Sequence, residues 1–146
     1  MTFNAADVFV QGPIDPAFAR ECAEAIGANP AVGAHLLFLG QIRADRLDAG
    51  VVRGIEYTAH QTMAQGAFTA LVDRAAAAGG LLEVTIRHSL GYVPVGGASL
   101  LIAVGAGHRD EAYRLSRDIL EAIKKEVPIY GREITEDDQS RWKVNR

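Results

Sequence analysis

Apolar and polar residues alternate along the chain with two different periods, and the changes between them divide it into strands and helices. Strands are predicted at residues 7–10, 33–43, 51–57, 82–88, 99–106 and 129–134, and helices at 15–26, 58–78 and 109–126. Polar or turn-rich segments are predicted at 44–50 and 91–97. Hairpins outnumber helical crossovers in this order, so we predict one α+β domain over residues 1–146, with a largely antiparallel sheet and three helices.

Capping residues indicate where the helices begin. Asp15 can accept hydrogen bonds from the free N–H groups of a first turn, and Pro16 suits the first helical position. Thr58 and Gln61 have the spacing of a capping box, which predicts the start of the second helix. The apolar face of that helix is predicted to consist of Met63, Ala64, Ala67, Phe68, Leu71, Val72 and Ala75.

Composition narrows the class of protein. The chain has 146 residues, 49% hydrophobic and 23% charged, as in a folded globular protein rather than a disordered one. Its net charge of −3 argues against a globally basic nucleic-acid binder but allows a local basic pocket. We see no signal peptide or bilayer-spanning stretch and expect a cytoplasmic protein with no membrane partner. The one cysteine, Cys22, fits a reducing compartment and is predicted to be a small buried residue.

Several familiar catalytic signatures are absent from the sequence. It contains no phosphate loop of the G-x-x-x-x-G-K-[ST] type, no G-x-G-x-x-G turn and no G-x-S-x-G nucleophile elbow. The four histidines, His35, His60, His88 and His108, lack the spacing of a zinc site. We therefore predict no metal site.

Cationic residues at the ends of predicted elements are the remaining candidates for chemistry. His108 and Arg109 lie where an apolar strand gives way to a helix, and a helix N-terminus favours anions. Lys124 lies in the last turn of that helix, Arg43 closes a buried strand, and Arg132 lies on the last strand. Each of these residues could instead have an ordinary structural role, such as complementing the helix dipole or reaching into solvent. If they converge, they form a basic pocket for a small phosphorylated substrate or an anionic peptide terminus.

The same positions carry a resemblance to a known family. Each marker is weak alone, but the ordered set is specific and spans roughly residues 8–142. The markers are Phe38 to Arg43, Glu56-Tyr57 with Met63, His88 to Gly91 with Pro94 and Gly96, His108-Arg109, Lys124, Val127 to Tyr130, Arg132-Glu133 and Ser140 to Trp142. On these residues the chain resembles the catalytic, or large, subunit of molybdopterin synthase.

The resemblance implies a fold, a reaction and partners. The implied fold is α+β of the α/β-hammerhead type. The implied reaction transfers sulfur from the C-terminal Gly-Gly thiocarboxylate of a small ubiquitin-like carrier to cyclic pyranopterin monophosphate, which forms the dithiolene of molybdopterin. Such subunits form a homodimer within a heterotetramer that includes the carrier, and this step needs no metal or organic cofactor.

The resemblance also implies roles for matching residues. Lys124 is implied to be essential for the chemistry, because a lysine can hold a carboxylate or phosphate and can move protons when its pKa is lowered. Arg43 and the pair His108-Arg109 are implied to hold the anionic substrate, the pair by reaching across the homodimer. The edge of the pocket is implied to include Phe38, Arg132 and Glu133.

One departure from the family pattern bears on the reaction. The family usually has a second functional lysine seven residues after the first, where this chain has Gly131. Three interpretations stay open: Lys125 or Arg132 supplies the missing cation, the enzyme works slowly with one lysine, or the chain is a diverged relative that binds the carrier or a phosphorylated pterin without catalysis. Period two along the last strand predicts Gly131 and Glu133 on one face and Arg132 on the other. A small phosphate-binding domain of another pathway is a further alternative.

Overall fold

Strands and helices follow one another in the predicted order over residues 2–137 and 140–143, which the computed structural model describes. The α+β class is confirmed, with three α-helices in the described part of the chain. Two short strands, β3 and β8, were not predicted. After a 3-10 turn at Ala5–Asp7 (η1), the elements are β1 (Phe9–Gln11), α1 (Pro16–Gly27), β2 (Ala34–Gln41), β3 (Arg46–Leu47), β4 (Gly50–Ala59), α2 (Gln61–Ala77), β5 (Leu81–Pro94), β6 (Ala98–Ala106), α3 (Arg109–Glu126), β7 (Ile129–Thr135) and β8 (Ser140–Trp142).

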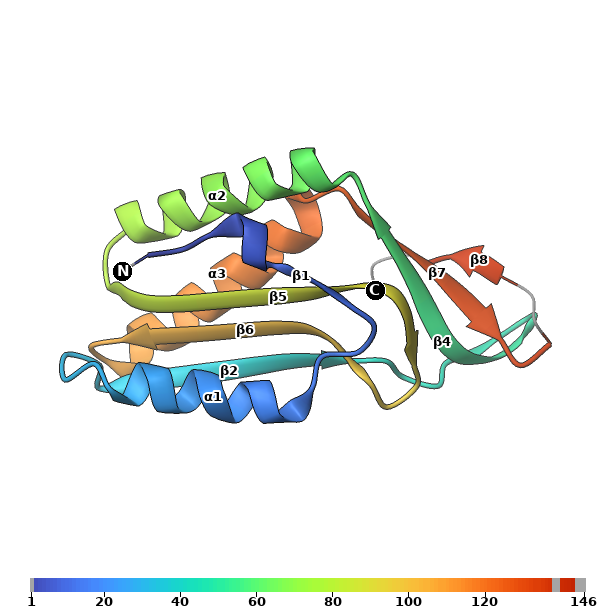
Figure 1. The fold of residues 1–146 in the computed structure, drawn as a ribbon, viewed down its shortest axis with the longest axis horizontal. Coiled ribbons are helices and arrows are strands. Elements are labelled where there is room, and N and C mark those ends of the chain that lie inside the picture. The colour runs from blue at the N-terminus through green and yellow to red at the C-terminus, as the bar shows by residue number, and fades with distance from the viewer. Residues whose placement is uncertain (1, 138–139, 144–146) are drawn as a thin grey trace.

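The described strands pair in the order β2-β6-β5-β4-β7-β8, with β1 beside β5 and β3 beside β4. All of these pairs are antiparallel except β1 with β5, so the largely antiparallel sheet is confirmed. Strands β2, β6 and β5 lie among the helices, whereas β4, β7 and β8 extend away from them (Figure 1). The second group of strands therefore has a face that no helix covers, and the candidate site forms where the two groups meet.

Strand β6 is apolar on both faces because helices cover both sides of it. Leu100, Ile102 and Val104 pack with α2 and α3, while Leu101 and Ala103 pack with α1 on the opposite side. A strand buried on both faces has a continuous apolar sequence rather than an alternating one. This explains why residues 99–106 are the most apolar stretch predicted as a strand.

Strand β5 is longer than predicted, because the segment 91–97 is not all turn. The strand continues to Pro94, pairing first with β6 and then, from Gly91 to Pro94, with β4. Gly91 has a φ of +79°, a left-handed conformation that glycine adopts without strain. The glycine therefore lets one strand pass from the first group of strands to the second.

The start of α2 also differs from the prediction. Thr58 remains in β4, and the helix is capped by His60, whose Nδ1 accepts a hydrogen bond from the Met63 N–H at 3.4 Å. Met63 is 59% exposed, so the predicted apolar face is wrong at this residue, and the buried face is Ala64, Phe68, Leu71 and Val72. The cap at Asp15 is confirmed by its hydrogen bond from the Ala17 N–H.

Cys22 is a free thiol on the buried face of α1, packed in the same cluster as Leu101 and Ala103 of β6, and its burial is as predicted. Burial is the main reason that its pKa is raised above the ordinary value for a thiol. None of the helices in the described residues is long and apolar enough to cross a membrane.

Candidate active site

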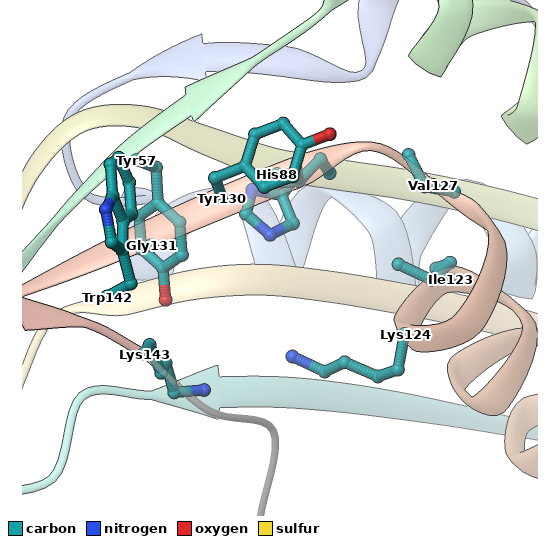
Figure 2. Close-up of a pocket in the computed structure, with 10 residues that line it drawn as sticks. Tyr57, His88, Ile123, Lys124, Val127, Tyr130, Gly131, Trp142 and Lys143 are labelled. Carbon is teal, nitrogen blue, oxygen red and sulfur yellow. The ribbon is translucent and has the colours of Figure 1, made fainter.

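Two adjoining hollows lie where the end of α3 faces β4, β7 and the residue after β8. Their volumes are about 330 and 380 Å³, at the lower end of the range of about 300–1,000 Å³ that small-molecule sites occupy. Both are lined by Tyr57, Lys124 and Lys143. The first hollow is completed by His88, Ile123, Val127, Ile129, Tyr130, Gly131 and Trp142 (Figure 2), and the second by residues that include Phe38, Arg43, Asp45, Ser99 and Glu133.

Lys124 reaches the hollows because of its place on an amphipathic helix. Its neighbour Ile123 is buried in the core, which fixes the rotation of the last turn of α3. The amine of Lys124 points across the first hollow toward the amine of Lys143 (Figure 2). Although Lys124 keeps contact with solvent, burial of its amine lowers its pKa; the charge of Lys143 lowers it further, and Glu121 opposes the shift. The residue can therefore act as a cation or lose its proton more readily than an ordinary lysine.

His88 forms a buried wall of the first hollow. Its Nδ1 lies 2.8 Å from the Ser89 carbonyl oxygen, and because a carbonyl only accepts, Nδ1 carries the proton. Burial lowers the pKa of His88 to about 4, against the effect of this hydrogen bond, and the charges of Lys124 and Lys143 lower it further. His88 is therefore a neutral ring at pH 7, packed edge-on against the ring of Tyr57 at 5.0 Å between centroids.

Tyr57 presents a protonated phenol to both hollows. Its hydroxyl lies 3.1 Å from the Ser99 Oγ, in a buried hydrogen bond in which either atom can donate. Burial raises the pKa of Tyr57, the bond to Ser99 opposes this, and the charge of Glu133 raises it again. The hydroxyl is thus available to hydrogen-bond a polar group without adding charge.

The second hollow contains charges of both signs. Glu133 is 2% exposed and lines this hollow together with Lys124 and Lys143. Arg43 also lines it; its side chain is 74% exposed, and its guanidinium pairs with the Asp45 carboxylate. The structure thus brings together Phe38, Arg43, Lys124 and Glu133 of the residues that the sequence singled out.

The other three singled-out residues lie elsewhere. His108 and Arg109 are at the opposite end of α3, about 22–24 Å from Lys124 along the helix axis at 1.5 Å per residue. There they line a shallow, open depression, and His108 Nδ1 lies 3.3 Å from Glu111 Oε1. Arg132 pairs with Glu56 across β4 and β7, at 3.1 Å. As period two predicted, Gly131 and Glu133 face the hollows, and Arg132 does not line them.

Sequence reasoning missed Lys143, which follows the tail marker at Trp142. Lys125 and Arg132, the residues considered as replacements for a lysine at position 131, line neither hollow in the described part of the structure. Lys143 lines both. The only local signal was its place two residues after Arg141, which does not predict a pocket.

The described residues contain no group of three or more His, Cys, Asp or Glu side chains placed to hold a metal ion. The chemistry available to the hollows from the residues themselves is that of two amines, a guanidinium, two carboxylates, two phenols and a neutral imidazole. Such a set can bind an anion, hydrogen-bond a polar ring system and move protons.

Comparison with protein families and curated proteins gives a consistent result. The family model described as MoaE protein matches residues 11–126. The chain is 36% identical over 145 residues to a molybdopterin synthase catalytic subunit of Aspergillus niger, covering 99% of this chain and 78% of that protein. It is 40% identical over 119 residues to one of Emericella nidulans, covering 82% of this chain and 60% of that protein.

Two solved structures with the same fold are bacterial proteins. A molybdopterin synthase from Staphylococcus aureus matches with a TM-score of 0.82 and 29% identity, over 99% of this chain and 100% of that one. A chain from a complex of subunits 1 and 2 of molybdopterin-converting factor from Helicobacter pylori matches with a TM-score of 0.79 over 95% and 90% of the two chains. At 21% identity, the second likeness is one of fold.

Proposed function

The chain belongs to the MoaE protein family, and on that premise we propose that it is the catalytic subunit of a molybdopterin synthase. It is then a sulfurtransferase that moves sulfur from a thiocarboxylated ubiquitin-like carrier to cyclic pyranopterin monophosphate. The observation that carries the proposal is that Lys124, within the matched residues 11–126, projects into a cationic hollow of small-molecule size.

The hollows suit the two reactants in size and charge. The substrate carries a phosphate and the carrier ends in an anionic thiocarboxylate, and Lys124, Lys143 and Arg43 offer charged donors to such groups. Phe38 and Tyr57 offer ring surfaces beside them. Because the two hollows share a wall, we assign one to the pterin and the other to the carrier's tail.

Lys124 is the group on which we place the chemistry. As a cation it holds the anionic reactant, and with its pKa lowered by burial it exchanges a proton more readily than a lysine in water. Tyr57 and neutral His88 stand beside it as uncharged hydrogen-bonding partners. Glu133, buried near both lysines, offsets their positive charge.

The assembly is the second part of the proposal. The Helicobacter pylori relative in fold was solved as a complex of two subunits, which supports binding of a small carrier subunit here. We further propose a homodimer within a heterotetramer, in which His108 and Arg109 serve the hollow of the second copy. Their distance from Lys124 along α3 supports this, since they cannot reach the hollow of their own chain.

We also propose that the protein works in the cytoplasm as one catalytic domain. The thiol of Cys22 is free and buried, which fits a reducing compartment. The diverged, non-catalytic interpretation rested on Gly131, and the second lysine lining the hollow removes its main support.

Reconstitution tests the function. The protein is mixed with thiocarboxylated carrier and cyclic pyranopterin monophosphate, and molybdopterin is measured as its fluorescent oxidation product. We expect product to form in proportion to the thiocarboxylated carrier supplied, and none with the carrier in its carboxylate form. Absence of product, while an established catalytic subunit works in the same mixture, would overturn the proposal.

A further inference from the structure

Two of the three lysines in the chain meet at the candidate site. The sequence contains only Lys124, Lys125 and Lys143. Lys124 comes from the last turn of α3 and Lys143 from the residue after β8, and both line both hollows. Figure 2 shows their amines extending toward one another from opposite walls. Two different elements thus deliver the same functional group to one place.

Strand pairing fixes the position of Lys143. Strand β8 pairs with β7 in a register that sets Trp142 opposite Arg132. Past the end of β8, the Lys143 N–H donates a hydrogen bond to the Gly131 carbonyl oxygen at 2.7 Å. This bond holds the backbone of Lys143 beside Gly131, on a strand that is itself anchored to β4.

Gly131 leaves the space that the side chain of Lys143 uses. A Cβ at position 131 would lie 3.6 Å from the Lys143 Cβ, 3.0 Å from Ile55 Cγ2 and 3.2 Å from a Tyr57 ring carbon. The backbone of residue 131 is ordinary strand, so conformation does not require glycine there. A long side chain at 131 and the one at 143 would therefore compete for the same part of the hollow.

We propose that Lys143 is the second substrate-binding cation of this active site, contributed by the C-terminal strand in the place of a side chain at position 131. The inference rests on the proposed function and deepens it, because it names a further residue for the same reaction. It also replaces Lys125 and Arg132, which the sequence had suggested for this role.

The charges around the two amines support this role. Two ammonium groups facing each other repel, and an anion between them relieves the repulsion, so the pair favours a phosphate or carboxylate over a neutral ligand. Among the groups that act on the Lys124 amine, Lys143 lowers its pKa and Glu121 raises it. The other titratable or charged side chains that line the two hollows are Glu133, Asp45, Arg43, Tyr57, Tyr130 and neutral His88.

The first experiment measures turnover of Lys143→Ala, Lys143→Arg and Lys125→Ala in the reconstituted assay. We expect Lys143→Ala to lower kcat/KM at least about tenfold, Lys143→Arg to stay within about threefold of wild type, and Lys125→Ala within about twofold. KM measured separately for the pterin and for the carrier shows which anion Lys143 holds. Equal losses in the alanine and arginine variants would overturn the proposal, because they would indicate packing rather than charge.

The second experiment moves the cation from one strand to its neighbour. In the Lys143→Ala background, Gly131→Lys is expected to recover activity at least about fivefold, because the added amine enters the space that Lys143 has left. In the wild-type background the same change is expected to give no gain, since that space is occupied. A large gain in the wild type, with no effect of Lys143→Ala, would show that the site lacks a second cation and that Lys143 does not supply one.

The third measurement does not depend on turnover. Acetylation rates of the three lysines against pH, read by mass spectrometry, give the pKa of Lys124 with Lys125 as internal reference. Lys143→Ala is expected to raise the pKa of Lys124, because one cause of its lowering is removed. An unchanged Lys124 profile would show that the amines do not face each other. If the wild type is inactive but this shift is seen, the proposed function fails while the paired-lysine site remains.

Discussion

The two ends of α3 both present cations, but they differ in what surrounds them. At the C-terminal end, Lys124 faces a hollow closed by β4, β7 and Lys143. At the N-terminal end, His108 and Arg109 are exposed to solvent. Among the residues that the structure describes, the polar partner of the His108 ring is Glu111, one helical turn away. Enclosure lowers the pKa of Lys124 and positions its amine, whereas at the open end we have proposed that His108 and Arg109 serve a second copy of the chain. We therefore expect changes at the enclosed end to affect chemistry, and changes at the open end to depend on assembly.

Removing Lys124 is the strongest way to test the difference between the ends. Lys124→Ala is expected to lower kcat at least about 1,000-fold, because the cation at the reacting group is lost from a partly desolvated site. Circular dichroism and thermal unfolding should be close to wild type, since the amine is not part of the core. Lys125→Ala, one residue along the same helix turn, is the matched control. Comparable losses in the two variants would show that only the charge of the helix end matters.

The buried His88 allows the enclosed end to be tested through the pH dependence of the free energy of unfolding. The folded pKa of His88, about 4, is below the unfolded value of about 6.5, so the folded state binds fewer protons between these values. Its contribution to stability is complete above pH 6.5 and is lost as the pH falls toward 4, by about 3 kcal/mol. Urea unfolding at pH 7 and pH 4 should show this loss in the wild type and a smaller one in His88→Gln.

His108→Gln is the matched control at the open end. Because its side chain is exposed, its replacement should leave the free energy of unfolding at pH 7 close to that of the wild type. If His88→Gln and His108→Gln destabilised the fold equally at pH 7, the distinction between an enclosed and an open end would be lost.

Arg109 tests whether the open end serves a second copy. Arg109→Ala is expected to raise KM for the pterin about tenfold, with little change in folding. At pterin concentrations well below KM, mixing Arg109→Ala with Lys124→Ala should raise the rate above the mean of the two parent variants, because half of the randomly formed dimers are mixed and each has one intact site, giving about a quarter of the wild-type rate. No recovery, with exchange of subunits verified by mass spectrometry, would mean that each chain uses its own Arg109.

Among these variants, Arg132→Ala is expected to have the smallest effect on stability and turnover. Its pair with Glu56 is about two-fifths exposed on both sides, and such surface pairs contribute about 0–1 kcal/mol. Arg132→Ala is therefore expected to change unfolding free energy by less than about 1 kcal/mol and turnover by less than about threefold. A loss approaching that of Lys124→Ala would place Arg132 at the reaction after all.

The sequence predicted the elements well where hydrophobic periodicity determines them. Strand β6 and helix α3 were found because burial on two faces or on one stripe leaves a clear pattern. The predicted start of α2 was wrong. Thr58 and Gln61 have the spacing of a capping box, but His60 is the residue that caps the helix. The extension of β5 was missed because glycine at position 91 indicates a turn and a strand bend equally well.

The site was predictable in part. Phe38, Arg43, Lys124 and Glu133 were identified through their place in the ordered family markers, and the structure brings them to one hollow. Lys143 was not predictable, because it reaches the hollow through the pairing of β7 with β8, a three-residue strand that is too short to leave a clear hydrophobic pattern. Gly131 pointed to a missing cation but not to the strand that supplies it.

The central claim, that the reactants bind between Lys124 and Lys143, is tested most directly by lysine footprinting. The chain's three lysines are acetylated with and without cyclic pyranopterin monophosphate and carboxylate-form carrier, and each site is quantified by mass spectrometry. We predict that Lys124 and Lys143 both become at least about fivefold less reactive, because a bound ligand buries most of its own surface and the groups that it touches, while Lys125 changes little. Protection of Lys125 alone, or equal reactivity at all three lysines with and without the reactants, would contradict the claim.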